Sequence, residues 1–350
     1  MFLKNQWYVA CRPDDVADRP FARTLLEQPM VFFRDALGVV TAVEDFCPHR
    51  GAPLSLGFVD SGQLVCGYHG LRLAADGSVA SMPKQRVHSF PCNRRFPTVE
   101  RYGFIWVWPG EPTLADPEAL PKFNWATDPG WAYGGGLYHV RADYRLMIDN
   151  LMDLTHETYV HASSIGQREI DEQPVRTKVI DETVVTSRVM ENVKAPPFWQ
   201  MAMEQRGLDP ESLVDRWQVC QFHAPSHVMI DVGVALAGNG GMDAPDEAKV
   251  RAVVVDFMTP ETPTSHWYFW GMARTWAVED ASVTEAVRSG QGAIFAEDLA
   301  ILEAQQRSLD LNPTRKLLML DIDAGGVQSR RLIQKLWDAE QASAGEVAHA

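Results

Sequence analysis

Two short segments of the sequence each carry one cysteine and one histidine at close spacing. The first reads Cys47-x-His49 and the second Cys66-x-x-His69, and a glycine follows soon after each histidine. Thiolates and imidazoles are common ligands for transition metals, so four of them in two short loops predict a metal site. The glycines allow the backbone to approach that metal closely, because they carry no Cβ atom.

Two kinds of metal centre use two cysteines and two histidines. A structural zinc ion accepts this set, but zinc fingers usually pair cysteine with cysteine and histidine with histidine along the chain. A Rieske [2Fe–2S] cluster needs two cysteines on one iron and two histidines on the other, and its histidines raise the potential so that it can accept electrons from a ferredoxin-like donor. Each loop here carries one ligand of each kind and can touch both irons. The pattern therefore favours the cluster, and a structural zinc protein acting as an interaction module is the alternative.

A second pair of metal ligands is suggested where His156 and His161 lie five residues apart beside several acids. Positions five apart on an ideal helix diverge by about 140°, because each residue turns the helix by about 100°. If both imidazoles bind one ion, the helix must loosen or end near Tyr159. Asp153 shares a helical face with His156, so its side chain can accept the second N–H of this ligand and orient the ring.

A third ligand is offered by Asp298, which lies within the apolar stripe of a predicted helix. The residues three and four positions away on either side are all apolar, so this carboxylate is predicted to be buried. Burying an unpaired carboxylate is very costly, and coordination to a cation offsets that cost. A buried ion pair is the alternative explanation. Glu297 faces another side of the helix and is the weaker candidate.

Two histidines and one carboxylate form the facial triad of non-haem Fe(II) oxygenases, which leaves coordination positions open. Beside a Rieske centre in the same chain, this triad indicates a division of labour. One site delivers electrons, and the other binds dioxygen next to a substrate. A non-enzymatic Rieske electron carrier is the distant alternative, but it leaves His156, His161 and Asp298 without a role.

The elements around the first site are predicted to be strands of a small all-β domain over residues 1–112. Short stretches rich in β-branched and aromatic residues are broken by glycine and proline, which is typical of strands and turns. We expect strands at 29–34, 38–43, 62–66 and 103–108. The Pro-Gly-Glu-Pro cluster that ends at Pro112 marks the predicted boundary.

The second site falls in a larger predicted domain over residues 113–340. Helices are predicted at 143–160 and 282–309, and strands at 175–189, 228–236, 250–258 and 266–273. Strands and helices without regular βαβ alternation indicate an α+β domain, with an antiparallel sheet flanked by helices. Residues 341–350 are predicted to be a disordered tail.

Length and composition exclude several classes of protein. A chain of 350 residues with 46% hydrophobic and 22% charged residues suits two globular domains. No apolar run approaches the roughly 18 residues of a membrane span, and the N-terminus carries no secretory signal, so we expect a soluble cytoplasmic protein. A net charge of −14 argues against nucleic acid as a partner. The odd number of five cysteines argues against a disulfide framework, and we expect buried structural thiols at Cys11, Cys92 and Cys220.

The metal-ligand pattern resembles that of the Rieske non-haem iron aromatic oxygenases over nearly the whole chain. The segments 5–11, 44–57, 150–166 and 321–330 are similar in particular to oxygenase subunits of the vanillate O-demethylase type. The resemblance implies one set of cluster ligands, which are Cys47, His49, Cys66 and His69. It also implies one set of ligands for a mononuclear Fe(II), which are His156, His161 and Asp298.

The resemblance further implies a ring-shaped homotrimer, in which the cluster of one subunit lies close to the iron of the next. Asp153 would then link His69 of the partner subunit to His156 and carry the electron path between subunits. Asn150 is expected near the iron, either as a polar group beside it or as an amide used in helix packing.

The reaction implied by the resemblance is O-demethylation of vanillate to protocatechuate and formaldehyde. A separate reductase carrying flavin and a plant-type [2Fe–2S] cluster would pass electrons from NADH, and O₂ would supply the oxygen atom. The aromatic acid is expected to bind along strands 228–236 and 250–258, with Asp231 and Asp256 as candidate polar pocket residues or, alternatively, as solvent-facing acids. Another methoxybenzoate such as dicamba, or the methyl group of an aryl sulfonate, is the alternative substrate.

Overall fold

The structure is a computed structural model that describes residues 1–86, 90, 92–162, 165–166 and 173–347. It divides into two compact units, and the first contains Met1–Lys122 together with Thr259–Thr262. The sequence placed the boundary at residue 112, ahead of this division. The segment that follows Pro112 is tied to the first unit because Trp7 Nε1 donates a hydrogen bond to Asp116 O at 2.8 Å.

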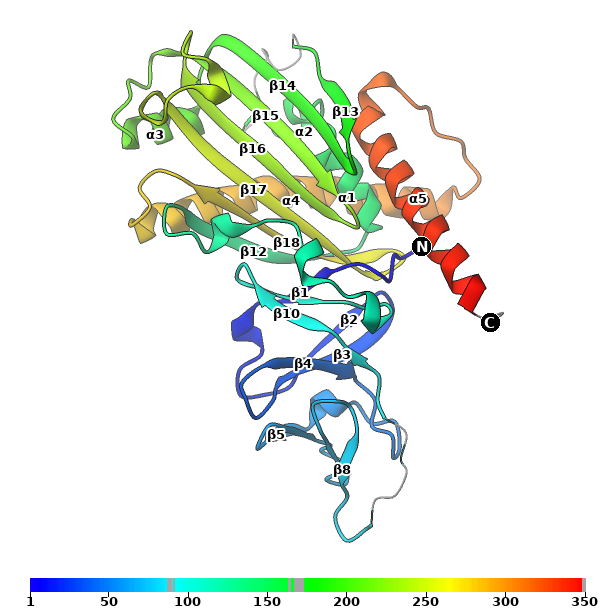
Figure 1. Cartoon of the computed structure of the whole chain (residues 1–350). Coiled ribbons are helices and arrows are strands. Elements are labelled where there is room, and N and C mark those ends of the chain that lie inside the picture. Colours follow the sequence, from blue (N-terminus) through cyan, green and yellow to red (C-terminus); the bar gives the residue numbers. More distant parts are fainter. Residues whose placement is uncertain (87–89, 91, 163–164, 167–172, 348–350) are drawn as a thin grey trace. The chain divides into compact units, whose positions relative to one another are not determined.

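Three antiparallel sheets make up the first unit within the described residues (Figure 1). The first has the order β1 (Tyr8–Cys11), β11 (Phe104–Val107), β10 (Thr98–Arg101). The second has the order β2 (Phe21–Leu25), β3 (Gln28–Arg34), β4 (Val40–Glu44), β9 (Arg95–Phe96). The third has the order β5 (Phe58–Asp60), β6 (Gln63–Val65), β7 (Arg72–Leu73), β8 (Val79–Ser81). The predicted all-β character is confirmed, and β3, β4, β6 and β11 fall where the sequence placed strands.

The core of the first unit holds the two Cys–His loops in place. Val31 and Phe33 are two residues apart on β3, so they face the same side of their sheet. They are fully buried and belong to the same apolar cluster as Val43, Cys47 and Cys66. Both cysteines are therefore fixed by the packing of the domain core rather than by loop structure alone.

A seven-stranded antiparallel sheet forms the second unit. Its order is β12 (Ala132–Val140), β18 (Ser265–Arg274), β17 (Lys249–Thr262), β16 (His227–Leu236), β15 (Leu213–His223), β14 (Thr183–Lys194), β13 (Arg176–Ile180). The helices are α1 (Tyr144–Leu151), α2 (Glu157–Val160), α3 (Pro197–Gln205), α4 (Ala281–Leu311), α5 (Ala324–Val347). The predicted α+β class with an antiparallel sheet is confirmed.

Helix α4 lies along the sheet and packs against β12 and β18, while α5 packs against α1 and β14 (Figure 1). Helix α4 begins at an N-cap, because the side chain of Asp280 accepts hydrogen bonds from Ser282 N at 2.8 Å and Val283 N at 3.2 Å. Its buried side chains recur at helical spacing and include Phe295, Asp298 and Leu302. Asp298 is thus carried on the face of α4 that meets the rest of the unit.

Several elements differ from the sequence-based predictions. The region 143–160 is two helices separated by a break rather than one helix. Strands β12 and β15 and helices α3 and α5 were not predicted. The prediction of a disordered tail over 341–350 is wrong for the residues up to Val347, because α5 continues to that residue. Residues 348–350 lie outside the described residues.

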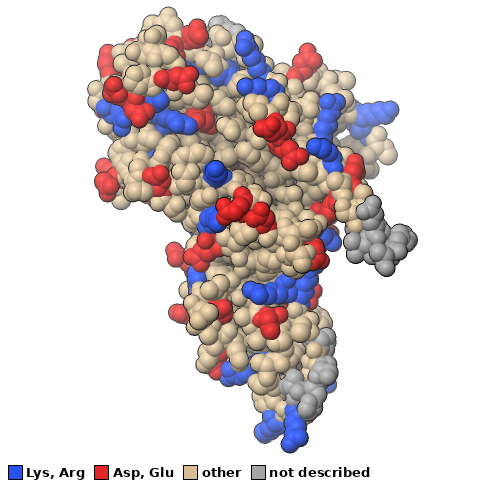
Figure 2. Space-filling model, in the orientation of Figure 1, with Lys and Arg blue, Asp and Glu red and all other residues tan. Residues whose placement is uncertain are grey.

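The surface carries both signs of charge. On the face drawn in Figure 2, acidic and basic side chains are interspersed, although the chain as a whole has a net charge of −14. Over the described residues, no helix combines the length and the apolar character needed to cross a membrane.

Candidate functional site

The two Cys–His loops share one backbone hydrogen-bond pattern. Gly51 N donates to Cys47 O at 2.8 Å, and Gly70 N donates to Cys66 O at 3.0 Å. Both glycines adopt the left-handed conformation, with φ of 70° at Gly51 and 73° at Gly70. Glycine is the residue that takes this conformation without a steric penalty. Two turns of one shape therefore present the two sets of ligands, as a binuclear cluster with paired ligands requires.

The cysteines of this site are buried and the histidines are exposed. The imidazole rings of His49 and His69 lie with their centroids 4.6 Å apart. Burial raises the pKa of the Cys47 thiol, the backbone N–H of His49 opposes this shift, and the nearby Cys66 reinforces it. As thiolate ligands, these two buried cysteines would need a cationic centre to offset their charge, which a metal cluster supplies.

The pairing of these four side chains favours a two-iron cluster over a single zinc ion. The side chain of Cys47 lies beside that of Cys66, and the ring of His49 lies beside that of His69. Like ligands in pairs suit a cluster in which one iron binds two cysteines and the other binds two histidines. The predicted structural thiols are confirmed as buried at Cys11 and Cys220, whereas Cys92 is exposed and that prediction is wrong.

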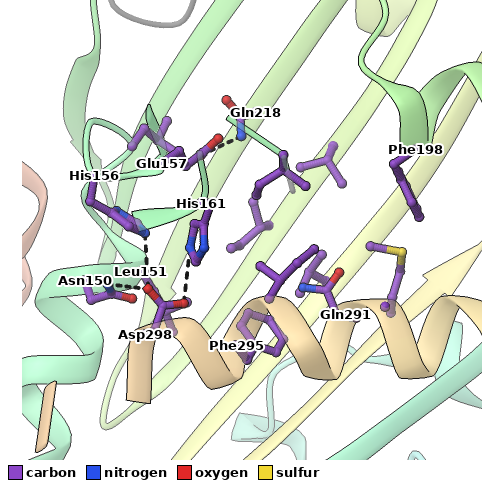
Figure 3. Close-up of a pocket in the computed structure, with 18 of the residues that line it drawn as sticks. Asn150, Leu151, His156, Glu157, His161, Phe198, Gln218, Gln291, Phe295 and Asp298 are labelled. Carbon is purple, nitrogen blue, oxygen red and sulfur yellow. Dashed lines mark hydrogen bonds and ion pairs between the residues drawn. The ribbon is translucent and has the colours of Figure 1, made fainter. Parts of the chain in front are cut away.

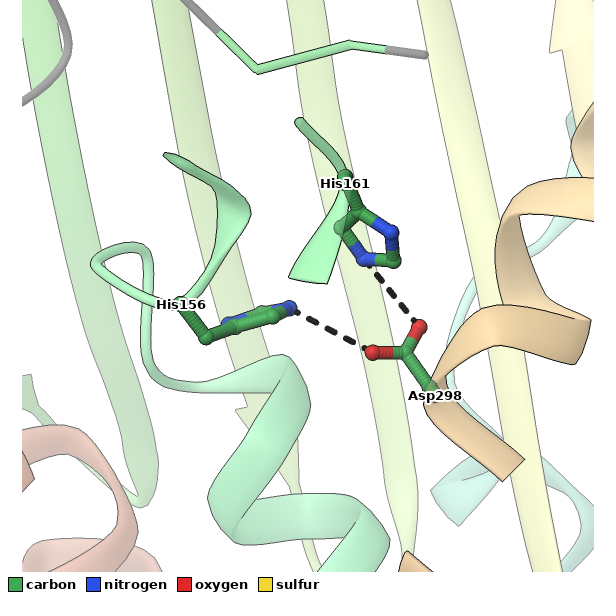
Figure 4. A group of neighbouring side chains, drawn as sticks. All are labelled: His156, His161 and Asp298. Carbon is green, nitrogen blue, oxygen red and sulfur yellow. Dashed lines mark ion pairs between the residues drawn. The ribbon is translucent and has the colours of Figure 1, made fainter. Parts of the chain in front are cut away.

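The other site is the group formed by His156, His161 and Asp298 (Figure 4). Helix α1 ends at Leu151, and the single turn of α2 begins after His156 and ends before His161. The expected end of the helix near Tyr159 is confirmed. Because each histidine flanks the turn rather than lying within a continuous helix, both imidazoles can face the same carboxylate.

The distances within this group suit a metal ion between its members. Nε2 of His156 lies 3.6 Å from Oδ1 of Asp298, and Nε2 of His161 lies 3.3 Å from Oδ2. The Asp298 side chain is only 3% exposed. Two imidazoles and a buried carboxylate form a donor set that fits a divalent cation such as Fe(II) and leaves coordination positions open.

Hydrogen bonds on the outer side of the group fix the orientation of both rings. Nδ1 of His156 lies 2.6 Å from Asp153 O, and Nδ1 of His161 lies 2.6 Å from Oε2 of Glu297. With Nδ1 bound in this way, Nε2 of each ring is directed to the metal position. Burial opposes the charged form of His161, but the carboxylates of Asp298 and Glu297 outweigh it and raise the pKa of the ring.

Two of the predicted neighbours of the triad can now be placed. Asp153 orients His156 through its backbone carbonyl and not, as expected, through its carboxylate. The carboxylate instead accepts hydrogen bonds from the N–H and the hydroxyl of Thr155, both at 2.7 Å, because it caps the turn before α2. Asn150 Nδ2 donates to Oδ1 of Asp298 at 3.0 Å, so the geometry supports the role of a polar group beside the triad.

A cavity of about 150 Å³ opens beside the triad (Figure 3). A cavity of this size holds one aromatic ring. Its polar wall includes Glu157, Arg216, Gln218 and Gln291. Its apolar wall includes Leu151, Ile165, Phe198, Ile230, Val254 and Phe295. The site therefore combines an open metal position with a mostly apolar slot for a flat molecule.

The structure does not bring the two predicted pocket acids to this cavity. Asp231 accepts hydrogen bonds from Arg251 and from Trp217 Nε1, the latter at 2.9 Å, and neither it nor Asp256 is among the described residues that line the cavity. Asp256 is fully buried and accepts a hydrogen bond from Tyr268 at 2.7 Å. Neither carboxylate matches the solvent-facing alternative, because both are buried.

The polar cavity residues that the sequence did not single out are Glu157, Arg216, Gln218 and Gln291. One signal was present for two of them. Arg216 and Gln218 are two residues apart in a stretch that is otherwise rich in apolar residues, so both occupy the same face of β15. A strand prediction at 213–223 would have placed them together.

Comparison with known proteins agrees with both sites. Residues 6–91 match the family model of the Rieske [2Fe–2S] domain. Residues 140–339 match the model of the vanillate O-demethylase oxygenase C-terminal domain. The fold and the two sites thus define a Rieske oxygenase with a separate mononuclear metal centre. Such a subunit implies a reductase component and an aromatic substrate.

Relatives extend the match over nearly the whole chain. A vanillate O-demethylase oxygenase subunit of Pseudomonas sp. strain HR199 is 61% identical over 98% of this chain and 97% of that protein. The crystal structure of dicamba monooxygenase bound to 3,6-dichlorosalicylic acid has a TM-score of 0.88 at 34% identity, covering 97% of this chain and 99% of that one. Dicamba monooxygenase with non-haem iron and dicamba has a TM-score of 0.82 at 34% identity, covering 98% and 99%. The chain belongs to the vanillate O-demethylase oxygenase family of Rieske non-haem iron monooxygenases.

Proposed function

We propose that this protein is the terminal oxygenase component that O-demethylates vanillate to protocatechuate and formaldehyde. The observation that carries the proposal is the triad of His156, His161 and Asp298 beside a mostly apolar cavity for one aromatic ring. The 61% identity to a vanillate O-demethylase oxygenase subunit supports the choice of substrate. Electrons would come from NADH through a separate reductase that carries flavin and a [2Fe–2S] cluster.

The proposed ligands divide between the two centres. The cluster would be held by Cys47, His49, Cys66 and His69. Fe(II) would be held by His156, His161 and Asp298. When bound, the iron supplies dioxygen activation and single-electron chemistry, which no amino-acid side chain provides.

The reaction consumes one O₂, one NADH and one proton for each methyl group removed. One oxygen atom enters a C–H bond of the methoxy group, and the other leaves as water. The resulting hemiacetal breaks its bond between the methylene carbon and the phenolic oxygen. The products are a phenol and formaldehyde, and the two electrons from NADH balance the reduction of O₂.

The side chains of this protein would position the reactants and exclude water. Glu297 and the carbonyl of Asp153 hold the Nδ1 atoms of the two histidines, which keeps each Nε2 available for the metal. The apolar wall, including Phe198 and Phe295, would hold the ring and keep bulk water from the reacting methyl group.

We also propose that the protein forms a homotrimer in which Asp153 links His69 of the partner subunit to His156. The exposed position of His69 supports this arrangement, because an exposed cluster ligand can approach a second chain. Size-exclusion chromatography with light scattering tests the assembly. A monomer at micromolar concentration that retains full turnover would contradict it.

A substrate panel tests the proposed reaction. NADH- and O₂-dependent formaldehyde release is measured with a matched reductase for vanillate, veratrate, dicamba and toluenesulfonate. Vanillate should give formaldehyde and protocatechuate in equal amounts and with the highest kcat/KM. Preference for another methoxybenzoate, which the similarity to dicamba monooxygenase makes the second candidate, would keep the class and overturn the substrate. Preference for the aryl sulfonate methyl group would also overturn it.

A further inference from the structure

The cavity contains a buried cationic side chain to which the proposed metal chemistry gives no role. Among the described residues, Arg216 is the one lysine or arginine that lines the cavity. It is only 3% exposed, although it carries a charged group. Taking a guanidinium out of water is costly, so this position calls for a physical reason.

Arg216 belongs to a buried polar network on one wall of the cavity. Its Nη2 lies 3.9 Å from Oε2 of Glu157, which is an ion-pair contact longer than a hydrogen bond. The other oxygen of Glu157 accepts a hydrogen bond from Gln218 Nε2 at 2.7 Å (Figure 3). Glu157 is therefore held in place by Gln218, and it also forms the ion pair with Arg216.

A second buried guanidinium belongs to the same network but is directed elsewhere. Arg188 donates from Nε to Oε1 of Gln218 at 3.2 Å and from Nη1 to Leu154 O at 2.8 Å. Its Nη2 lies 3.5 Å from Oε1 of Glu157. Arg188 and Arg216 thus share Glu157, and Arg216 is the member that reaches the cavity.

The electrostatics of this wall favour an anion in the cavity. Burial lowers the pKa of Arg216 to about 10, Glu157 opposes that shift, and Arg188 adds to it. Arg216 therefore stays charged at neutral pH in a position of low solvent exposure. A guanidinium has five N–H donors arranged in a planar fork, so it can interact with Glu157 and with a carboxylate ligand at the same time.

We propose that Arg216 binds the carboxylate of the aromatic substrate and so selects aromatic acids over neutral aromatic ethers. The proposal deepens the function proposed above and rests on it, because vanillate carries a carboxylate meta to the methoxy group that is to be demethylated. The apolar lining residues would hold the ring, with the methoxy group directed to the triad and the carboxylate to Arg216.

Gln291 is the competing anchor on the opposite wall. It lies seven residues before Asp298 on α4, which is about 10 Å along the helix axis and on the same face. Figure 3 shows it directed into the cavity, and its amide makes no hydrogen bond within the described part of the chain. A neutral amide can bind a carboxylate or a carboxamide equally well, whereas a guanidinium discriminates between them by charge.

The test compares ligands with and without the charge. Benzoate and its neutral isostere benzamide are titrated by calorimetry into the holoenzyme, as wild type, Arg216→Gln, Arg216→Lys and Gln291→Leu. Turnover of vanillate is compared with that of guaiacol, which lacks the carboxylate. Arg216→Gln should weaken benzoate binding and lower kcat/KM for vanillate by about 10- to 150-fold, the range expected for hydrogen bonds to a charged group. Benzamide binding and guaiacol turnover should change by less than threefold.

The remaining arms keep the proposal open to refutation. Arg216→Lys retains the charge without the planar fork and should lose less than Arg216→Gln, while Gln291→Leu should keep the preference for benzoate. If wild type binds benzoate no more tightly than benzamide, or if only Gln291→Leu removes the preference, the proposal is overturned, even when Arg216→Gln fails to fold. Wild type that binds benzoate in an Arg216-dependent manner but releases no formaldehyde from vanillate would instead overturn the proposed reaction alone.

Discussion

The hydrogen bond between Glu297 and His161 gives a sharp prediction about metal affinity. Replacing Glu297 by alanine removes the acceptor 2.6 Å from Nδ1 of His161 and leaves all three triad residues in place. The ring can then rotate or adopt the other tautomer, so Nε2 is no longer held toward the metal. We expect weaker binding of Fe(II) with an unchanged [2Fe–2S] cluster.

The magnitude follows from the geometry. A hydrogen bond to a charged acceptor contributes about 1.5–3 kcal/mol, and loss of such a ligand partner typically weakens metal binding about 10- to 100-fold. The Glu297 side chain is 33% exposed, so solvent screens the interaction and the lower part of the range applies. The Kd for Fe(II) should therefore rise about 10- to 30-fold. Glu297→Gln, which retains an acceptor, should show a smaller rise.

The assay is anaerobic equilibrium dialysis of Fe(II) against a chelator of known affinity, with the visible absorbance of the cluster as an internal reference. Glu303→Ala is the matched control, because Glu303 lies on the same helix and accepts a hydrogen bond from Arg141 N instead of from a triad residue. A Kd for Glu297→Ala within twofold of the wild-type and control values would show that Glu297 does not hold His161 for the metal.

Two further predictions concern stability, measured as thermal unfolding midpoints. Gly135→Ala places a Cβ 2.2 Å from the backbone oxygen of Trp270 and should lower the free energy of unfolding by about 1–3 kcal/mol. Gly290→Ala, in α4, places a Cβ that meets nothing within 4 Å and should raise the free energy of unfolding by about 0.5–1 kcal/mol. Equal effects of the two substitutions would contradict this prediction. Burial raises the pKa of Asp256 to about 8, against about 3.9 when unfolded, so the folded chain keeps a proton that the unfolded chain has lost. Stability should fall by up to about 1.4 kcal/mol per pH unit as the pH rises from 4 to 8, and Asp256→Asn should remove this contribution. An unchanged slope in Asp256→Asn would refute it.

The proposed metal ligands could be identified from the sequence because their spacing is local. Each Cys–His loop is a few residues long, and His156 and His161 flank one helical turn. Asp298 was recognisable because a carboxylate in an apolar helical stripe conflicts with simple burial. In each case, one short segment contains the whole signal.

The groups that orient and surround these ligands depend on contacts between distant segments. Sequence spacing placed the carboxylate of Asp153 near His156. It could not show that this carboxylate accepts a hydrogen bond from Thr155 N, and that the backbone carbonyl of Asp153 is the group that contacts the His156 ring. Arg216 on β15 lies beside Glu157 on α2, and no local sequence pattern reveals a contact between segments so far apart in the chain. Asp231 and Asp256 lie on strands that were predicted correctly, but neither of them is among the described residues that line the cavity.

The missed strand β12 has a different cause. Its centre is Gly134-Gly135-Gly136, which lacks the β-branched side chains that favour strand predictions. The structure explains the glycines, because a Cβ at Gly136 would lie 2.3 Å from the Trp270 ring. Close packing against a tryptophan on the neighbouring strand overrides local propensity here.

The most direct test of the account is the reaction of an Asp298→Ala protein with vanillate, NADH, O₂ and a matched reductase. We expect this variant to lose about one iron per chain, to keep the absorbance of its Rieske cluster, and to release neither formaldehyde nor protocatechuate, whereas the wild type should release the two in equal amounts. Turnover by the variant at the wild-type rate, or a colourless wild-type protein that contains zinc instead of iron, would contradict the proposed role of the two iron centres.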